Sequence, residues 1–172
     1  MRIFITGAQG TGKSTLVKRL EEELPSLHTH DSMSREFMDF KDEQFGEDFQ
    51  YKISLYCLDM YVNDHDFISS RSYFDSIAYP SMNEKYNDIV SMVRLYKKYL
   101  FQDDCIYFYL PIEFDISSDG NDLRCVDKEY QRKIDSLIRL EIASLSKEEQ
   151  EKVITLHGSV EERMDQIMKA LL

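Results

Sequence analysis

The sequence is poor in cysteine, proline and glycine, and it has no tryptophan. It contains three Cys, three Pro and six Gly among 172 residues. The cysteines, Cys57, Cys105 and Cys125, are odd in number, widely spaced and without a C-x-x-C pair, which argues against a disulfide framework and a structural zinc site. We therefore expect reduced thiols, as is usual in cytoplasmic proteins.

Long apolar runs are also missing. The stretch at residues 3–6 is too short for the apolar region of a signal peptide, and no run reaches the ~20 residues of a membrane-spanning helix. We expect no signal peptide, no membrane partner and a cytoplasmic location. The sequence shows no internal repeat, low-complexity tract or linker rich in Pro, Gly and Ser, so its length suits a single domain over residues 1–172.

Basic residues are scarce relative to acidic ones. The chain has 21 Lys plus Arg against 32 Asp plus Glu, a net charge of −11. So acidic a protein repels a nucleic acid backbone unless its basic residues gather in one place. This balance disfavours DNA as a partner and favours a small phosphorylated substrate.

The most informative stretch is residues 7–14, which read G-A-Q-G-T-G-K-S, a complete G-x-x-x-x-G-K-[ST] pattern. An apolar, β-branched stretch precedes it and an amphipathic one follows at 15–24, as expected for a strand and a helix around a phosphate-binding loop. The loop N–H groups and the helix dipole attract phosphate. Lys13 would reach the β and γ phosphates, and Ser14 would bind Mg²⁺. The alternative is a glycine-rich turn before an ordinary helix.

The pattern predicts ATP and Mg²⁺ as cofactors. The nucleotide-binding residues that it predicts are Gly7, Gln9, Gly10, Thr11, Gly12, Lys13, Ser14 and Thr15.

The rest of the chain alternates expected strands and helices, which favours a parallel sheet covered on both faces. We expect a three-layer α/β/α P-loop NTPase fold with a five-stranded, mostly parallel sheet and a lid region at about 113–132. The expected strands are 2–6, 27–31, 66–70, 104–110 and 153–157. The expected helices are 13–24, a short one after 31–35, 49–61, 75–101 with a break near Pro80, 127–145 capped by Asp127, and a last one capped by Ser159 and Glu162.

Candidate acceptor residues stand where expected strands end at the edge of the sheet that carries the loop. Asp31 ends the second strand, and Arg35 follows one helical turn later; they would orient and deprotonate an acceptor hydroxyl or hold an acceptor phosphate. The alternative is that Asp31 only caps the next helix. Arg71 and Asp75 follow the third strand at i and i+4, where they would clamp the acceptor or form a solvated ion pair.

Arg124, Lys128 and Arg132 recur every four residues after a polar loop that contains Gly120. This spacing is typical of a lid that carries arginines to the transferring phosphate, and the alternative is an exposed basic face.

Two further groups are weaker candidates. His28 and His30 alternate and would share one strand face, but no third metal ligand with suitable spacing is evident in the sequence. Four aromatic residues would either stack on a base or, as is more usual, pack in the core: Tyr51, Tyr56, Phe67 and Tyr73.

With these residues identified, the chain resembles the P-loop kinase group that includes thymidylate kinase-like enzymes, nicotinamide riboside kinases and small phage-type nucleoside or nucleotide kinases. The resemblance covers nearly the whole length, and only its first motif is highly specific. It rests on G-A-Q-G-T-G-K-S at 7–14, D-S-M-S-R at 31–35, S-R-S-Y-F-D-S-I-A-Y at 70–79, R-C-V-D-K-E-Y-Q-R-K-I-D at 124–135 and G-S-V-E-E-R at 158–163.

The resemblance implies roles for the candidates. It makes Asp31 the carboxylate near the acceptor, Arg35 and Arg71 acceptor-binding residues, Arg124 and Arg132 lid arginines, and Gly158 and Ser159 a turn near the adenine. Together with the motif and the strand ends, this predicts Lys13, Asp31, Arg124 and Arg132 as the catalytic residues and Asp31, Arg35, Arg71 and Asp75 as the acceptor-binding residues. Such kinases often have Asp where this chain has Ser70, so magnesium binding falls to Ser14, the phosphates and water, with Asp31 as a further candidate ligand.

The sequence therefore leads to one main hypothesis and two alternatives. The main one is ATP- and Mg²⁺-dependent phosphoryl transfer to a nucleoside or nucleotide, with a deoxynucleoside monophosphate as the favoured acceptor. The alternatives are a kinase of a modified base in DNA, such as 5-hydroxymethyluracil, and a nucleotide-dependent switch without efficient transfer. The sequence does not decide between a monomer and a homodimer.

Overall fold

The computed structural model describes residues 1–30, 49–114 and 127–172, and within them strands and helices alternate. The strands are β1 (Arg2–Thr6), β2 (His28–His30), β3 (Phe67–Ser69), β4 (Cys105–Tyr109) and β5 (Val153–Thr155). The α-helices are α1 (Lys13–Glu23), α3 (Phe49–Asn63), α4 (Tyr73–Ala78), α5 (Asn87–Leu95), α6 (Lys97–Leu100), α7 (Lys128–Ala143), α8 (Lys147–Gln150) and α9 (Val160–Leu171). Two 3₁₀ turns, η1 (Pro80–Met82) and η2 (Glu84–Tyr86), join α4 to α5.

The five strands form one parallel sheet in the order β2-β3-β1-β4-β5, which confirms the predicted α/β architecture. β1 is central, and all five of its residues are buried. Because every strand runs in the same direction, the chain leaves each one at the same edge of the sheet, next to the loop that follows β1.

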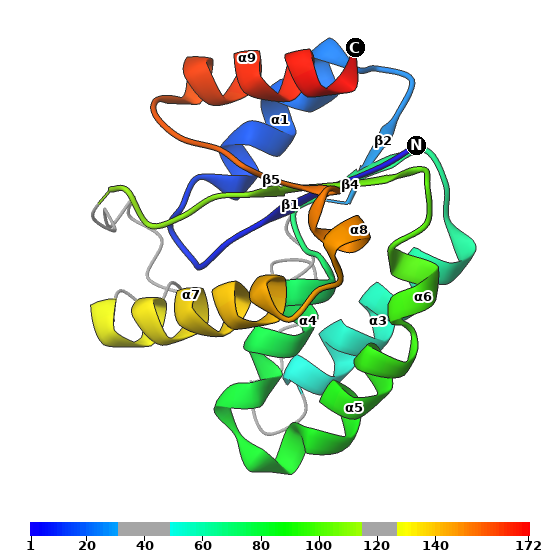
Figure 1. Cartoon of the computed structure of the whole chain (residues 1–172), viewed down its shortest axis with the longest axis vertical. Coiled ribbons are helices and arrows are strands. Elements are labelled where there is room, and N and C mark those ends of the chain that lie inside the picture. Colours follow the sequence, from blue (N-terminus) through cyan, green and yellow to red (C-terminus); the bar gives the residue numbers. More distant parts are fainter. Residues whose placement is uncertain (31–48, 115–126) are drawn as a thin grey trace, which may run out of the picture.

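Helices cover both faces of this sheet, as Figure 1 shows: α1 and α9 lie on one face, and α3, α4, α5 and α7 lie on the other. The alternation of strand side chains separates two cores. Ile3 and Ile5 pack with the apolar residues of α1 and α9, whereas Phe4 and Tyr107 pack with those of the opposite helices.

The structure corrects one expected helix. The region 75–101 begins earlier, at Tyr73, because Ser72 is the N-cap of α4 and Asp75 is the third residue of its capping box. It is then divided into α4, two 3₁₀ turns, α5 and α6.

The short helix expected after 31–35 lies outside the described residues, and the remaining expected helices, 13–24, 49–61, 127–145 and the last one, are close to those observed. The predicted caps of α7 by Asp127 and of α9 by Ser159 with Glu162 are confirmed.

Core packing accounts for half of the aromatic residues considered for stacking on a base. Phe67 and Tyr73 are buried in the core, Tyr51 is half-buried against it, and Tyr56 is exposed. Cys57 and Cys105 are buried and form no disulfide bond among the described residues, and Cys125 lies outside these residues. In the described part of the chain, no helix is sufficiently long and apolar to cross a membrane.

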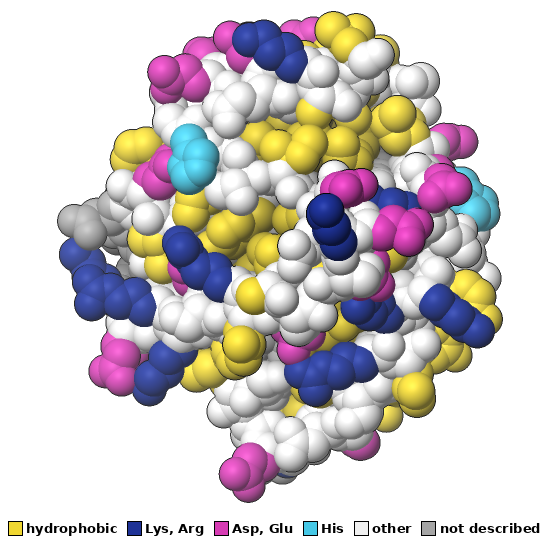
Figure 2. Space-filling view, viewed as in Figure 1, with side chains coloured by type: hydrophobic (Ala, Val, Ile, Leu, Met, Phe, Trp, Pro, Cys, Tyr) yellow, Lys and Arg dark blue, Asp and Glu magenta, His cyan; other side chains and the backbone are white. Residues whose placement is uncertain are grey.

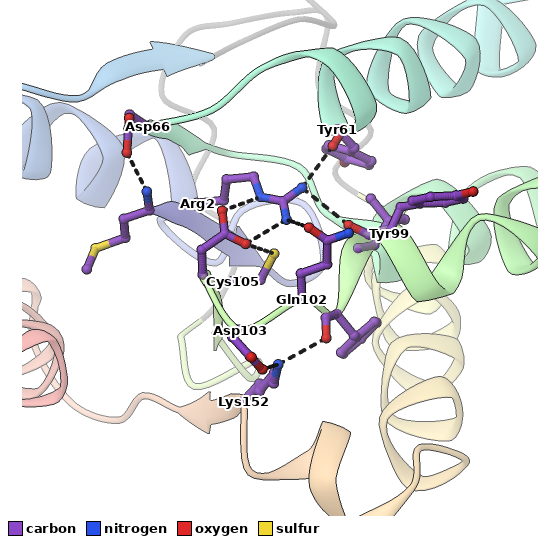
Figure 3. Close-up of polar contacts among 12 residues, drawn as sticks. Arg2, Tyr61, Asp66, Tyr99, Gln102, Asp103, Cys105 and Lys152 are labelled. Atoms are coloured by element: carbon purple, nitrogen blue, oxygen red, sulfur yellow. Dashed lines mark hydrogen bonds and ion pairs between the residues drawn. The ribbon is translucent and has the colours of Figure 1, made fainter.

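Arg2 lies at the start of β1, at the edge of the sheet opposite the loop. Its side chain is 2% exposed, and its guanidinium is fully hydrogen-bonded (Figure 3). Its guanidinium bonds both carboxylate oxygens of Asp104 at 3.0 and 2.7 Å, the carbonyl oxygens of Tyr61 and Tyr99 at 3.0 and 3.2 Å, and Oε1 of Gln102 at 3.1 Å. This residue joins β1 to α3 and to the segment before β4. Sequence reasoning gave it no role.

Candidate active site

The predicted phosphate-binding loop lies between β1 and α1 and depends on glycine at two positions. A Cβ atom at Gly7 would lie 2.6 Å from the carbonyl oxygen of Leu110, so a side chain there would collide with the backbone that follows β4. Gly12 has a φ of 94°, in the left-handed region, and is the residue from which α1 begins. The loop therefore turns directly into a helix N-terminus, where backbone N–H groups lack helical partners.

Side chains of the loop are held by its own carbonyl groups. The Lys13 ammonium donates to the carbonyl oxygen of Ala8 at 2.8 Å and to that of Gly7, and Thr11 Oγ1 donates to the Ala8 oxygen at 2.9 Å. Because the lysine stem is flexible, its ammonium can exchange carbonyl oxygens for phosphate oxygens. Ser14 and Thr15 lie in the first turn of α1, with Ser14 half-buried and Thr15 exposed.

Three side chains from distant segments brace the loop. Gln131 on α7 donates from Nε2 to the backbone oxygen of Gln9 at 2.7 Å, and the hydroxyl of Tyr79 donates to Oε1 of Gln9 at 3.3 Å. Arg163 on α9 donates from Nη1 to the backbone oxygen of Thr11 at 2.9 Å. The shape of the loop is thus determined jointly by both helical layers.

Sequence reasoning missed these braces, although two of them left a detectable pattern. Arg163 stands between Val160 and Ile167 in the buried stripe of α9, and Gln131 stands one turn before Ile134 in that of α7. A long polar side chain in an apolar stripe needs a buried partner, which is the signal that was available.

The carboxylate of Glu113 supports the same loop through a network of hydrogen bonds that includes Arg163. Glu113 accepts hydrogen bonds from Arg163 Nη2 at 2.8 Å and from the backbone N–H of Gly158 at 2.9 Å, and it lies 2.5 Å from Nδ1 of His157. Burial alone would raise the pKa of Glu113, but the hydrogen bonds from Arg163, His157 and Gly158 lower it to about 2. The Gly158–Ser159 turn is thereby connected to the loop through Glu113 and Arg163.

This network predicts a loss of stability in acid. The pKa of Glu113 is lower in the folded chain, about 2, than the ordinary value of 4.5, so the ionised form stabilises the fold above about pH 4.5. That contribution is lost as the pH falls through the folded value. Because the side chain is 23% exposed, we expect it to be worth about 1–2 kcal/mol.

Replacing Glu113 by Gln should therefore lower the free energy of unfolding at pH 7 and flatten its fall between about pH 5 and pH 2. Urea unfolding followed by circular dichroism at several pH values measures both effects. Glu148→Gln, which changes an exposed carboxylate on α8, is the control and should keep the wild-type slope. An unchanged acid slope in Glu113→Gln would contradict the assignment.

On the acceptor side, Asp75 is fully buried beside the loop, which corrects one alternative drawn from the sequence. Its Oδ2 accepts hydrogen bonds from Thr6 Oγ1 at 2.7 Å, Ser72 Oγ at 2.8 Å and the Ser72 N–H at 3.0 Å. The alternative that Arg71 and Asp75 form a solvated ion pair is wrong, because the Asp75 carboxylate is buried and hydrogen-bonded to Thr6 and Ser72. The Oδ1 atom of Asp75 is buried, and within the described part of the chain it has no hydrogen-bond partner.

Arg71 lies beside the same group. Its guanidinium carbon is 5.1 Å from the centre of the Tyr79 ring, and its buried Nη1 atom has no hydrogen-bond partner among the residues that the structure describes. Tyr79 also contacts Gln9 of the loop, so Arg71 and the phosphate-binding loop share one neighbour. A buried guanidinium nitrogen without a partner is costly, and an anionic ligand would satisfy it.

The remaining candidates are placed less completely. Asp31, Arg35 and Arg124 lie outside the described residues. Arg132 is exposed on α7, next to the loop-bracing Gln131, and the exposed Lys128 lies one turn earlier on the same side of the helix. Of the lid region expected at 113–132, Glu113 belongs to the network behind the loop, and the end from Lys128 onward is the start of α7.

Comparison with known proteins gives the family and the fold of the chain. A family model described as an AAA domain matches residues 2–163. No curated protein matches the chain in sequence.

Solved structures are similar over nearly the whole chain. Deoxyadenosine kinase from M. mycoides, solved with dCMP and dCDP, has 17% identity and a TM-score of 0.66 over 99% of this chain and 98% of its own. Thymidylate kinase from Ehrlichia chaffeensis has 16% identity and a TM-score of 0.59 over 100% and 98%. The NadR protein in complex with NR has 16% identity and a TM-score of 0.73 over 99% of this chain, which spans only 50% of NadR. The expected fold of P-loop nucleoside and nucleotide kinases is confirmed.

Proposed function

The chain belongs to the AAA-domain family, and from this premise we propose that it is an ATP- and Mg²⁺-dependent kinase of a nucleoside or nucleotide, with a deoxynucleoside monophosphate as the favoured acceptor. The observation that carries the proposal is the position of Arg71. Arg71 follows β3, the strand next to β1, and its Nη1 has no partner among the described residues. Its guanidinium packs against Tyr79, which bonds Gln9 of the loop that follows β1.

This arrangement suits transfer between two phosphorylated molecules. A phosphate-binding loop holds the donor, and a guanidinium from the neighbouring strand end holds the acceptor anion, so the reacting groups are brought together by adjacent strands. A monophosphate is largely ionised near pH 7 and has no proton to lose at the attacking oxygen. Its oxygen attacks the γ-phosphorus, the bond to the β-phosphate oxygen breaks, and ADP leaves.

The other residues take the roles expected from the sequence. Lys13 would neutralise the β and γ phosphates, and Arg124 and Arg132 would approach the transferring group from the lid. Arg35 and Asp75 would help to bind the acceptor, and the turn at Gly158 and Ser159 would lie near the adenine. Asp31 would orient a phosphate acceptor, or act as general base if the acceptor were a hydroxyl.

Magnesium fits the oxygen donors beside the loop. Ser14 offers a hydroxyl at the start of α1. Asp75 is bonded to Thr6, the last residue before the loop, and offers a carboxylate oxygen that bonds no other described residue. Hydroxyl and carboxylate oxygens are ligands that Mg²⁺ accepts. When bound, the ion would offset charge on the transferring phosphate. Ser70, which replaces the Asp often found in such kinases, is buried.

The charge distribution supports a small acceptor over a DNA chain. On the face shown in Figure 2, basic and acidic side chains are interspersed, and the whole chain carries a net charge of −11. Phosphate-backbone binding needs gathered positive charge. Activity on a duplex that contains 5-hydroxymethyluracil, with none on monomers, would select the DNA-base alternative.

The test of the function is acceptor-stimulated release of ADP across a panel of nucleosides and their monophosphates. We expect turnover with at least one deoxynucleoside monophosphate and dependence on Mg²⁺. Tight ATP binding with no stimulation by any acceptor would favour the nucleotide-dependent switch, which the Ser70 substitution motivates.

Replacing Arg71 by Leu should raise the KM for the acceptor about 10- to 100-fold, because a charge-assisted hydrogen bond to its phosphate is lost. The KM for ATP should change little. Arg19→Leu, which removes an exposed arginine from α1, is the control and should change neither value. Equal effects of Arg71→Leu on both substrates would place Arg71 outside the acceptor site.

A further inference from the structure

We propose that His28, His30 and Asp64 form a binding site for a transition-metal ion of the Zn²⁺ type that joins the edge strand β2 to the connection between α3 and β3. His28 begins β2, whereas the proposed acceptor residue Asp31 directly follows His30 at the end of the strand. The sequence showed the two histidines but no third ligand, since Asp64 is 34 residues beyond His30. The fold supplies it.

The backbone brings the three side chains together. His28 and His30 are two residues apart on β2, so their rings lie on the same face of the strand, with ring centres 5.6 Å apart. Asp64 directly follows α3, whose last residue is Asn63. β3 follows shortly after Asp64 and pairs with β2, so the connection that contains Asp64 passes beside the start of β2.

The distances are close to those of a metal site. Nε2 of His28 lies 3.0 and 2.9 Å from the two Asp64 oxygens, and Nε2 of His30 lies 2.6 Å from Oδ2. One ligand atom from each residue lies within 4.8 Å of the others. Ligands at ~2.0–2.2 Å around a tetrahedral ion lie ~3.3–3.5 Å apart, so each imidazole nitrogen would move away from the Asp64 carboxylate by less than about 1 Å to admit the ion.

The ligand set identifies the class of metal. Two imidazole nitrogens and a carboxylate oxygen suit Zn²⁺, Co²⁺ or Ni²⁺, whereas Mg²⁺ and Ca²⁺ prefer oxygen ligands alone.

The three proposed ligand side chains differ in how far they are exposed to solvent. The side chains of His30, Asp64 and His28 are 19%, 29% and 57% exposed. The inner part is supported by the edge of the Phe67 ring, whose centre is 5.2 Å from that of His30. The outer part is open to solvent, so an ion can enter and water can complete its coordination.

The position of the group makes a structural role the expected one. His28 is in register with Phe67 and, one strand further, with Arg2, at the edge of the sheet opposite the phosphate-binding loop. β2 is an edge strand of three residues, held only by β3 on one side. A bound ion would add a cross-link between this strand and the chain that enters β3, and it would stabilise the fold by binding the native state.

The test is Zn²⁺ titration of the untagged, chelator-treated full chain by calorimetry, with Mg²⁺ in excess to occupy oxygen-ligand sites. We expect one equivalent to bind and to raise Tm. His28→Asn and Asp64→Asn should each weaken binding by about a hundredfold or more and remove the Tm increase. Co²⁺ in place of Zn²⁺ should give a visible absorption spectrum of histidine and carboxylate ligands, without thiolate bands.

Controls are available beside the site. His65→Asn and Asp66→Asn change the same residue types next to Asp64 but outside the three ligands, and they should leave binding unchanged. Circular dichroism of each variant without metal checks folding, and the exposed His28 is the variant least able to disturb it. The proposal would be overturned if the wild type bound no Zn²⁺, or if His28→Asn and Asp64→Asn bound Zn²⁺ as tightly as the wild type.

Discussion

Replacing Lys13 by Met is expected to lower kcat/KM for phosphoryl transfer about 10²- to 10³-fold, which corresponds to about 3–4 kcal/mol of transition-state stabilisation. Lys13 places a positive charge in the loop, where its ammonium contacts the carbonyl oxygens of Gly7 and Ala8. When the phosphates bind, the same charge would offset the negative charge that spreads over the transferring group. Methionine keeps the length of the stem and removes only the ammonium.

The measurement is steady-state ADP release with the preferred acceptor, together with ATP affinity by calorimetry. Lys18→Met is a matched control, since Lys18 is exposed on the same helix, five residues further along. It should retain wild-type kinetics. If Lys13→Met kept more than about a tenth of the activity, the loop would not be the site of phosphoryl transfer.

Replacing Arg2 by Leu is expected to lower the free energy of unfolding by about 3–5 kcal/mol, a large part of the about 5–15 kcal/mol that holds a typical domain together. The substitution leaves the carbonyl oxygens of Tyr61 and Tyr99 and the amide of Gln102 without their donor. Asp104 is 39% exposed and can turn to water, so most of the loss comes from the other acceptors, above all the buried carbonyl oxygen of Tyr61.

Urea unfolding followed by circular dichroism at 222 nm is the suitable measurement, because the chain has no tryptophan for fluorescence. Arg19→Leu removes an arginine of similar length whose ion pairs with Glu22 and Glu161 are exposed, and it should cost less than about 1 kcal/mol. Equal losses for the two variants would mean that the Arg2 contacts contribute no more than a surface ion pair. Because Arg2 lies at the far edge of the sheet, the folded variant should keep its kinetic constants.

The two predictions concern opposite edges of one sheet, and they differ in how far the sequence could anticipate them. The loop at 7–14 was recognisable because its function needs fixed residue types at fixed spacing. Arg2 was not recognisable, because its partners are 59 to 102 residues away and no local pattern connects them.

The candidate site divides in the same way. The position of Arg71 after β3 was predicted, but the burial of Asp75 and its hydrogen bond to Thr6 were not. The capping box of Ser72 and Asp75 is a local pattern that explains why the helix starts at Tyr73, and it was available in the sequence. Asp31, Arg35 and Arg124 stay predictions from sequence, since they lie outside the described residues.

By itself, the sequence determined the order of strands and helices, the parallel sheet and the phosphate-binding loop. These follow from hydrophobic periodicity, capping residues and one motif, all of which act over a few neighbouring residues. Only the tertiary structure decided that Gln131, Tyr79 and Arg163 brace the loop and that Asp64 joins His28 and His30. Such contacts join residues distant in the chain, and their pairing depends on how helices and strands pack in three dimensions.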